Sequence, residues 1–134
     1  MTAFLEAAQR AVEAGLAYAR ERELKMTIAV VDVTGTVSAA ARIDGARTIT
    51  YEIALAKANT ALAFQAPTAD LKERVKPENK VAIGQLSSRP IAFLGGGVPI
   101  LRGGEVAGAI GASGGSEEQD VECALACLAA FDET

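Results

Sequence analysis

Residues 89–120 decide the fold, and they read RPIAFLGGGVPILRGGEVAGAIGASGGSEEQD. Three apolar runs in this stretch are separated by two glycine turns, and a third glycine turn leads into acidic residues. Short apolar runs bounded by glycine are typical of antiparallel strands joined by tight turns. We therefore predict a three-stranded meander, with Gly95-Gly96-Gly97 and Gly103-Gly104 as its loops, whose last strand leads into a helix.

The helix after the meander has a clear start signal. Ser116 and Gln119 are spaced as a capping box, in which each side chain accepts a hydrogen bond from the other residue's backbone N–H. Glu117, Glu118 and Asp120 complement the positive end of the helix dipole. We predict a helix from this point to the end of the chain.

The first 43 residues show first a helical and then a strand pattern. Residues 2–23 carry apolar side chains at a 3.6-residue spacing, which predicts an amphipathic helix. Residues 26–33 are β-branched and almost entirely apolar, which is typical of a strand covered on both faces. A turn at Thr34 and Gly35 returns the chain as a second strand over 36–43.

An alanine-rich helix is predicted over residues 49–64. On it, Ala54, Ala58 and Ala61 form a face made only of methyl groups, which permits close approach to a sheet. Residues 72–88 are polar and lack a clear period, so we predict a long loop there with at most one short element.

Together these elements predict a single α+β domain over residues 1–134. The predicted order is α-β-β-α-(α)-β-β-β-α, where the bracketed helix is one further turn at 68–71. Both strand groups are joined by turns too short for parallel crossovers. We therefore expect a five-stranded antiparallel sheet packed by helices.

Composition removes several classes of function. The 134 residues contain no histidine, which excludes serine or cysteine catalysis assisted by histidine and every histidine metal ligand. The net charge of −4, without a cluster of cations, argues against nucleic-acid partners. Cys123 and Cys127 are interpreted as a buried, reduced pair, because two ligands are too few for a metal site.

Composition also predicts where the protein works and whether it is alone. The start of the chain lacks a basic and apolar leader, and no uncharged stretch is long enough to cross a bilayer, so a cytoplasmic location without membrane contact is expected. Half of the residues are hydrophobic, yet only 4% are aromatic. This surplus of small apolar residues predicts a homo-oligomer.

The chain resembles the GlcG/HbpS-like family, also called the haem-degrading domain family, and is similar to the accessory domain of PduO-type corrinoid adenosyltransferases. The resemblance covers nearly the whole chain and keeps its blocks in order. The blocks are IAVVD at 28–32 with Gly35, ARIDGA at 41–46, EIALAKANTA at 52–61, PTADL at 67–71, GGGVP at 95–99, and GEVAGAIGASGG at 104–115 with Gln119 and Asp120.

The resemblance implies a profilin-like or PAS-like layered fold, assembly into dimers or larger oligomers, and binding of a small ligand. Some members are linked to haem or other tetrapyrroles, and others to catabolic pathways. Because this chain has no histidine, haem is disfavoured as a cofactor. Binding it would need a Tyr, Lys or Thr ligand or a mode without coordination.

Lys57 is the first candidate for a functional residue. It interrupts an apolar stripe that includes Ile53, Thr60 and Phe64, and it either reaches solvent past a partly buried helix or anchors an anion in a cleft. Periodicity alone favours a lysine that reaches solvent. With the family block that contains Glu52, Lys57 and Thr60, anchoring of an anion is an equally supported interpretation. Glu52 lies about 140° around the helix from Lys57, so the two cannot form a pair on one face.

Glycines and strand ends supply the remaining candidates for ligand binding. Arg42 and Asp44 stand at the end of the second strand beside Gly45, where they form an exposed ion pair or where Arg42 holds a carboxylate. Gly95, Gly96 and Gly97 either serve hairpin geometry or bring backbone N–H groups to a ligand. Ser113, in the last glycine-rich block, completes the predicted ligand-binding set with Lys57, Thr60 and Phe64.

These residues predict two alternative functions. The first is a binding protein that holds an anionic metabolite or tetrapyrrole between the helix of Lys57 and the glycine turns. The alternative is a small-molecule enzyme with proton-transfer chemistry, such as an isomerase or hydratase acting on a carboxylated intermediate, with Lys57 or Glu52 as the catalytic base.

Overall fold

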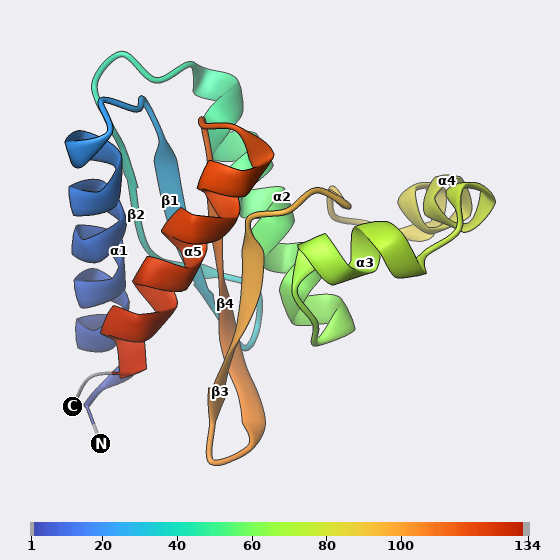
Figure 1. Ribbon diagram of the computed structural model, residues 1–134. Helices are drawn as coiled ribbons and strands as arrows, with labels where there is room; N and C mark the ends of the chain where they lie inside the picture. Colours follow the sequence, from blue (N-terminus) through green and yellow to red (C-terminus); the bar gives the residue numbers. More distant parts are fainter. Residues whose placement is uncertain (1, 133–134) are drawn as a thin grey trace.

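Four strands and five helices make up residues 2–132, which are the residues that this computed structural model describes (Figure 1). In chain order they are α1 (Phe4–Glu21), β1 (Thr27–Asp32), β2 (Val37–Arg42), α2 (Thr48–Phe64), α3 (Thr68–Arg74), α4 (Pro77–Leu86), β3 (Gly97–Arg102), β4 (Glu105–Ser113) and α5 (Glu117–Asp132). None of these helices combines the length and the apolar character needed to cross a membrane.

The strands form one antiparallel sheet in the order β2-β1-β4-β3. Ile28 pairs with Ala41 on one side and with Ala112 on the other, which places β1 in the interior of the sheet. Helices α1 and α5 cover one face, and α2 covers the other (Figure 1). This three-layer arrangement explains the apolar character of residues 26–31, because this part of the chain is buried on both faces, whereas Val33 beyond the strand is exposed.

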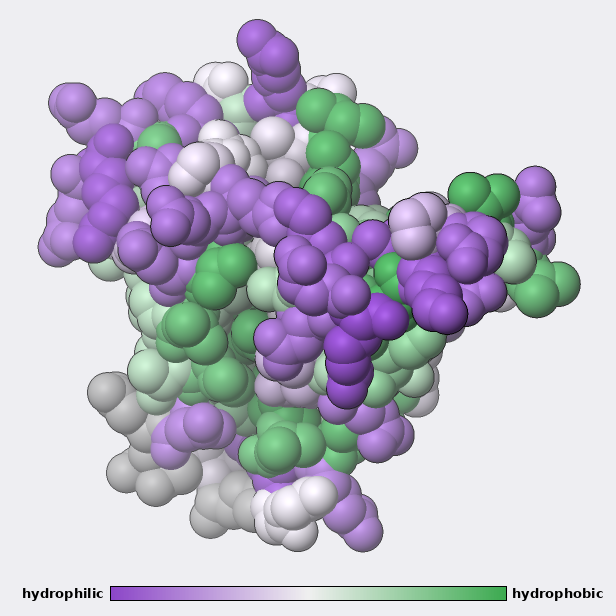
Figure 2. All heavy atoms as spheres, turned by 45° about the vertical axis from the view of Figure 1, so that its right-hand side comes forward, coloured by the Kyte–Doolittle hydropathy of each residue, from purple (hydrophilic) through white to green (hydrophobic). Residues whose placement is uncertain are grey.

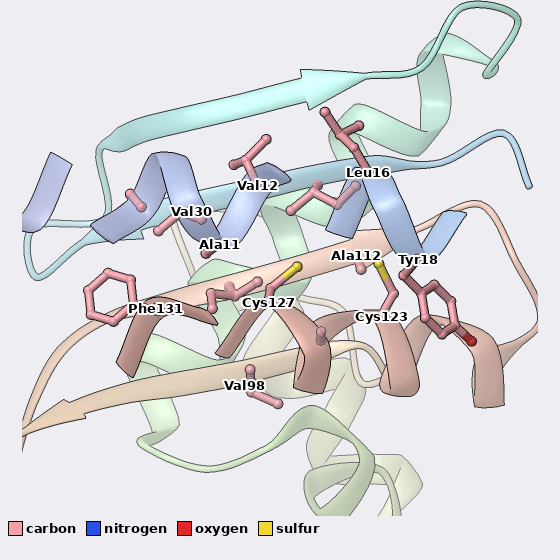
Figure 3. Close-up of a cluster of buried hydrophobic side chains, with 14 of the residues drawn as sticks. Ala11, Val12, Leu16, Tyr18, Val30, Val98, Ala112, Cys123, Cys127 and Phe131 are labelled. Atoms are coloured by element: carbon pink, nitrogen blue, oxygen red, sulfur yellow. The ribbon is translucent and has the colours of Figure 1, made fainter. Parts of the chain in front are cut away.

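The main hydrophobic core lies between the sheet and the pair α1 and α5 (Figure 3). Phe131, Cys123 and Cys127 of α5 point into it, and both cysteines are free thiols. A hydrogen bond with Cys123 and burial raise the pKa of the Cys127 thiol well above its ordinary value. These cysteines therefore behave as small apolar residues, as the sequence predicted.

The methyl face predicted on α2 lies directly on the sheet. Ala54, Ala58 and Ala61 are fully buried. A Cβ built on Gly111 of β4 would lie 1.9 Å from the carbonyl oxygen of Ala54, so α2 rests on bare backbone at this point. The small residues on both surfaces make this close approach sterically feasible.

The predicted fifth strand is not formed, so the expectation of a five-stranded sheet is wrong. Residues 91–94 have no strand conformation, and β3 is the edge of the sheet. The edge that this segment would need is obstructed, because Thr68 of α3 exchanges hydrogen bonds with the N–H and C=O groups of Gly97 and because Pro99 has no N–H. Instead, the Ala92 N–H donates to the Thr60 hydroxyl, and the segment crosses toward α2.

The predicted loop over 72–88 contains the helix α4. Pro77 stands at its first turn, where proline is favoured, and no residue of α4 is buried. A helix without a buried face has no apolar stripe, which is why the periodicity gave no signal. With the end of α3, this helix forms an arm that projects from the body of the protein (Figures 1 and 2).

Candidate functional site

Lys57 lies in a buried ion pair between α2 and α5. Its side chain is almost completely enclosed, and Nζ lies 2.8 Å from Oδ2 of Asp120 and 3.0 Å from the carbonyl oxygen of Ala112. Burial raises the pKa of Asp120, although Lys57 and the Gly115 amide act in the opposite direction. This geometry ties α2 to the start of α5.

The start of α5 is fastened by a second acidic residue, Glu117. Its carboxylate accepts hydrogen bonds from Lys72 of α3 at 2.8 Å and from the backbone N–H of Gly95 at 3.1 Å. These two bonds lower the pKa of Glu117. The predicted capping box is also formed, because Ser116 and Gln119 each accept a hydrogen bond from the other's backbone amide.

The triple glycine lies within this network. A Cβ on Gly96 would lie 2.7 Å from the carbonyl oxygen of Ala112 and 2.9 Å from Nζ of Lys57, and one on Gly97 would lie 2.4 Å from the carbonyl oxygen of Lys57. Gly96 also has a φ of +124°. Protein atoms therefore occupy the space beside Gly96 and Gly97, and these glycines allow the turn to pack against α2.

The other predicted ligand-binding residues are distributed around α2. The Thr60 hydroxyl donates to the Ala56 carbonyl and accepts from Ala92, while Phe64 makes an edge-to-face contact with Phe93. Arg42 donates to the carbonyl oxygen of Ala46, and Asp44 is exposed in the same turn. The structure thus brings Lys57 together with the triple glycine but separates both from Arg42 and Asp44.

A cleft of about 450 Å³ opens on the side of α2 that faces the turn between β1 and β2. We call it the Arg89 cleft. Its lining comes from α2, from this turn, and from the segment between α4 and β3. The residues are Gly35, Tyr51, Glu52, Leu55, Ala56, Asn59, Arg89 and Pro90.

Arg89 is held in place by both neighbouring elements. One guanidinium nitrogen donates to the side-chain oxygen of Asn59 at 3.4 Å, and the other donates to the carbonyl oxygen of Thr34 at 3.1 Å. A Cβ on Gly35, which has a φ of +82°, would lie 1.7 Å from the guanidinium. The glycine in this turn therefore makes room for Arg89.

The composition of the cleft suits an amphipathic anion. Leu55, Ala56 and Pro90 supply an apolar wall, and the exposed Arg89 supplies a fixed positive charge with several donors. A larger hollow of about 670 Å³ near the turn between β3 and β4 has no cation among its lining residues, so it suits an anion less well. No group of three potential metal-ligating residues is present within residues 2–132.

Sequence reasoning found only Glu52 among the residues that line this cleft. Arg89 stands apart from the glycine turns that were predicted to bind a ligand, and next to a stretch interpreted as loop. Asn59 is within the family block at 52–61, but the residues three and four positions away from it on the helix are all leucine or alanine. The sequence offered one relevant signal, which is Gly35 in a hairpin turn close to Asp32. A glycine there indicates that another group packs closely against the turn, but it does not indicate that this group is Arg89.

Known proteins match this chain over most of its length. A Citrobacter freundii protein described as an uncharacterized 15.0 kDa protein in the dhaT-dhaS intergenic region is 35% identical over 131 residues, which are 95% of this chain and 92% of that protein. The corrinoid adenosyltransferase PduO of Citrobacter freundii is 34% identical over 117 residues, which are 85% of this chain but 34% of that protein.

A solved structure described as a PduOC:heme complex has the same fold. Its TM-score is 0.88 at 28% identity, over 98% of this chain and 95% of that one. Together with the PduO match, this similarity confirms the resemblance to PduO-type proteins. The model of the family described as "Haem degrading protein HbpS-like" matches residues 4–129, and the chain therefore belongs to the HbpS-like family.

Proposed function

We propose that this protein binds a small, amphipathic carboxylated molecule in the Arg89 cleft. The observation that carries this proposal is a guanidinium fixed by two hydrogen bonds at the edge of an apolar hollow. A guanidinium can hold a carboxylate through two parallel hydrogen bonds, and the apolar wall can hold the body of the ligand.

A tetrapyrrole is the ligand class that the family supports best. The structure described as a PduOC:heme complex contains haem, an apolar macrocycle that carries carboxylates. The residues of the Arg89 cleft fit such a group, since Arg89 would hold a carboxylate and Leu55 would contact the macrocycle. Tyr51, with its phenol oxygen, is the lining residue that would ligate an iron in place of histidine. Iron held in this way would supply redox or oxygen chemistry.

Titration of the purified protein with haem, followed by absorbance, tests this proposal. Arg89→Gln should weaken binding by about tenfold, because hydrogen bonds to charged groups are the strong ones. Arg20→Gln removes an exposed cation from α1 and should leave the affinity unchanged. Equal affinities of the two variants would contradict the Arg89 cleft as the site, and no change of the haem spectrum would exclude haem as its ligand.

One feature favours the enzyme alternative. Glu52 lines the Arg89 cleft, so its carboxylate could take a proton from a substrate whose own carboxylate is bound by Arg89. Lys57 does not line this cleft, and its ammonium is already paired with Asp120. Exchange of substrate hydrogen for deuterium in heavy water, abolished by Glu52→Gln but retained in Arg20→Gln, would support this alternative.

We also propose that the protein forms a homo-oligomer through the arm of α3 and α4. Val81 is 62% exposed and Leu86 is 86% exposed, so the arm carries apolar side chains in solvent (Figure 2). A groove of about 360 Å³ on α5 could receive this apolar surface, because Val121 lies in it. The groove is also acidic, since its other lining residues are Glu117, Glu118 and Glu122. The arm carries the cations Arg74 and Lys76, which suits docking into this groove on a second copy.

A further inference from the structure

A separate cavity, of about 470 Å³, lies at the N-terminal end of α2. It is lined by Lys25, Gly45, Arg47, Ile49, Thr50, Ser113, Gly114 and Gly115. These residues come from the segment before β1, from the start of α2 and from the turn between β4 and α5. The cavity shares no lining residue with the Arg89 cleft, so a ligand here would bind independently of the proposed function.

The electrostatics of this cavity favour an anion. Lys25 and Arg47 contribute two positive charges, and neither Asp nor Glu is among the residues that line it. The first turn of α2 contains no acidic residue, and its N-cap residue Arg47 makes no side-chain cap hydrogen bond. The Thr50 N–H already donates to the carbonyl oxygen of Arg47, but the N–H groups of Thr48 and Ile49 lack an intrahelical acceptor and add the positive end of a 17-residue helix.

Ser113 supplies an unpartnered hydrogen-bonding group in the same place. The residue is 5% exposed, and its hydroxyl has no hydrogen-bond partner within the described residues 2–132. It pairs with Thr27 across the sheet, and Thr27 contacts Thr50 of α2, so the Ser113 side chain lies on the α2 side. Every fully enclosed side-chain N or O atom of the described residues has a partner. The Ser113 hydroxyl therefore opens on the cavity.

The acidic side chains at the start of α5 are already bound by other groups of the protein. Asp120 is paired with Lys57 and also accepts a hydrogen bond from the Gly115 N–H, and Glu117 is paired with Lys72. Gly114 has a φ of +133°, and a Cβ there would lie 2.3 Å from the carbonyl oxygen of Lys25. Glycine at this position therefore lets the turn between β4 and α5 lie against the segment that carries Lys25.

We infer that this cavity binds a phosphate group, either as free phosphate or as the phosphate of a small metabolite. The helix amides and the Ser113 hydroxyl would donate hydrogen bonds to its oxygens, and Lys25 and Arg47 would balance its two charges. A volume of about 470 Å³ is in the range of pockets for small organic molecules, which leaves room for the rest of a phosphorylated ligand.

Amide chemical shifts of the labelled protein give a direct test, with inorganic phosphate and glycerol phosphate as separate probes at constant ionic strength. Saturable shifts at Thr48, Ile49, Gly114 and Gly115 are expected with at least one probe. Saturation by inorganic phosphate would identify free phosphate as sufficient, and saturation by glycerol phosphate alone would identify a phosphate ester. The absence of saturable shifts with both probes in the millimolar range would overturn the inference.

Variants separate this site from general attraction of anions. Arg47→Gln should weaken phosphate binding by about tenfold, and Ser113→Ala should weaken it without a change of net charge. Arg20→Gln carries the same change of charge as Arg47→Gln at an exposed position that does not line the cavity, and it should bind as the wild type does. If Arg20→Gln and Arg47→Gln lose affinity equally, or if Ser113→Ala binds normally, the assignment is overturned. Thermal unfolding of each variant verifies that it is folded.

Discussion

At the scale of single residues, the burial of Lys57 changes the role that its charge is expected to have. The residue is 2% exposed, and its ammonium has a carboxylate and a carbonyl oxygen as partners. A buried ammonium needs such partners, because an unpaired charge in a protein interior is strongly unfavourable. The geometry therefore supports a role in holding α2 to α5, while its predicted role in ligand binding stays a prediction.

Lys57→Ala should lower the free energy of unfolding by about 3–5 kcal/mol, since it leaves Asp120 buried without its partner. Urea unfolding followed by circular dichroism measures this loss. Lys72→Ala, which removes a half-exposed ion pair with Glu117, should lower it by at most about 1 kcal/mol. If ligand binding by the folded fraction of Lys57→Ala is unchanged in calorimetry, Lys57 is not a ligand-binding residue.

The raised pKa of Tyr18 should make the protein less stable at high pH. Burial and a hydrogen bond to Glu122 raise its pKa from 10.0 to about 12. Between these values the unfolded chain has lost the phenol proton and the folded chain retains it, so the free energy of unfolding falls as the pH rises through this window. Tyr18→Phe should show a weaker dependence on pH between 10 and 12 in thermal unfolding. An unchanged slope would contradict the assignment to Tyr18.

At the scale of elements, the contact between α2 and β4 depends on glycine. Gly111→Ala would place a Cβ 1.9 Å from the Ala54 carbonyl oxygen, so α2 would have to move away from the sheet. We expect the free energy of unfolding to fall by at least about 1–3 kcal/mol, the usual effect of overpacking.

The control for Gly111→Ala is the same substitution in α4. Gly84 has no atom within 4 Å of a built Cβ. Gly84→Ala should leave the stability unchanged or raise it by up to about 1 kcal/mol, because alanine favours a helix. Equal effects of both substitutions in urea unfolding would show that α2 does not rest on the backbone of β4.

At the scale of the whole molecule, the arm of α3 and α4 makes the oligomeric state testable. Leu86→Asp places a negative charge on the surface proposed to meet the acidic groove of α5, so the protein should shift toward monomer. Sedimentation velocity at several protein concentrations measures this shift. Leu5→Asp makes the same change on α1, where Leu5 is 50% exposed, and should leave the oligomer intact. Dissociation by Leu5→Asp alone would place the interface elsewhere.

The fold could be predicted from the sequence wherever the residues that define a helix, strand or turn lie close together in the chain. The capping box at Ser116, the Gly103-Gly104 turn and the apolar run of β1 each depend on residues close together in the chain, and each was correctly predicted. The fifth strand failed because pairing depends on a distant partner, and Thr68 of α3 already occupies the N–H and C=O groups of Gly97.

The sequence by itself determined the α+β class, the family resemblance and the absence of histidine chemistry, because these depend on composition and local pattern. Only the tertiary structure decided what stands beside the glycine turns of residues 89–120. It placed the buried pair of Lys57 and Asp120 there, 63 residues apart in the chain, and it set Arg89 against Asn59 and the turn at Gly35. Such pairs arise from the packing of helices and strands against one another. They cannot be inferred from the sequence around either partner, because the two partners are far apart in the chain.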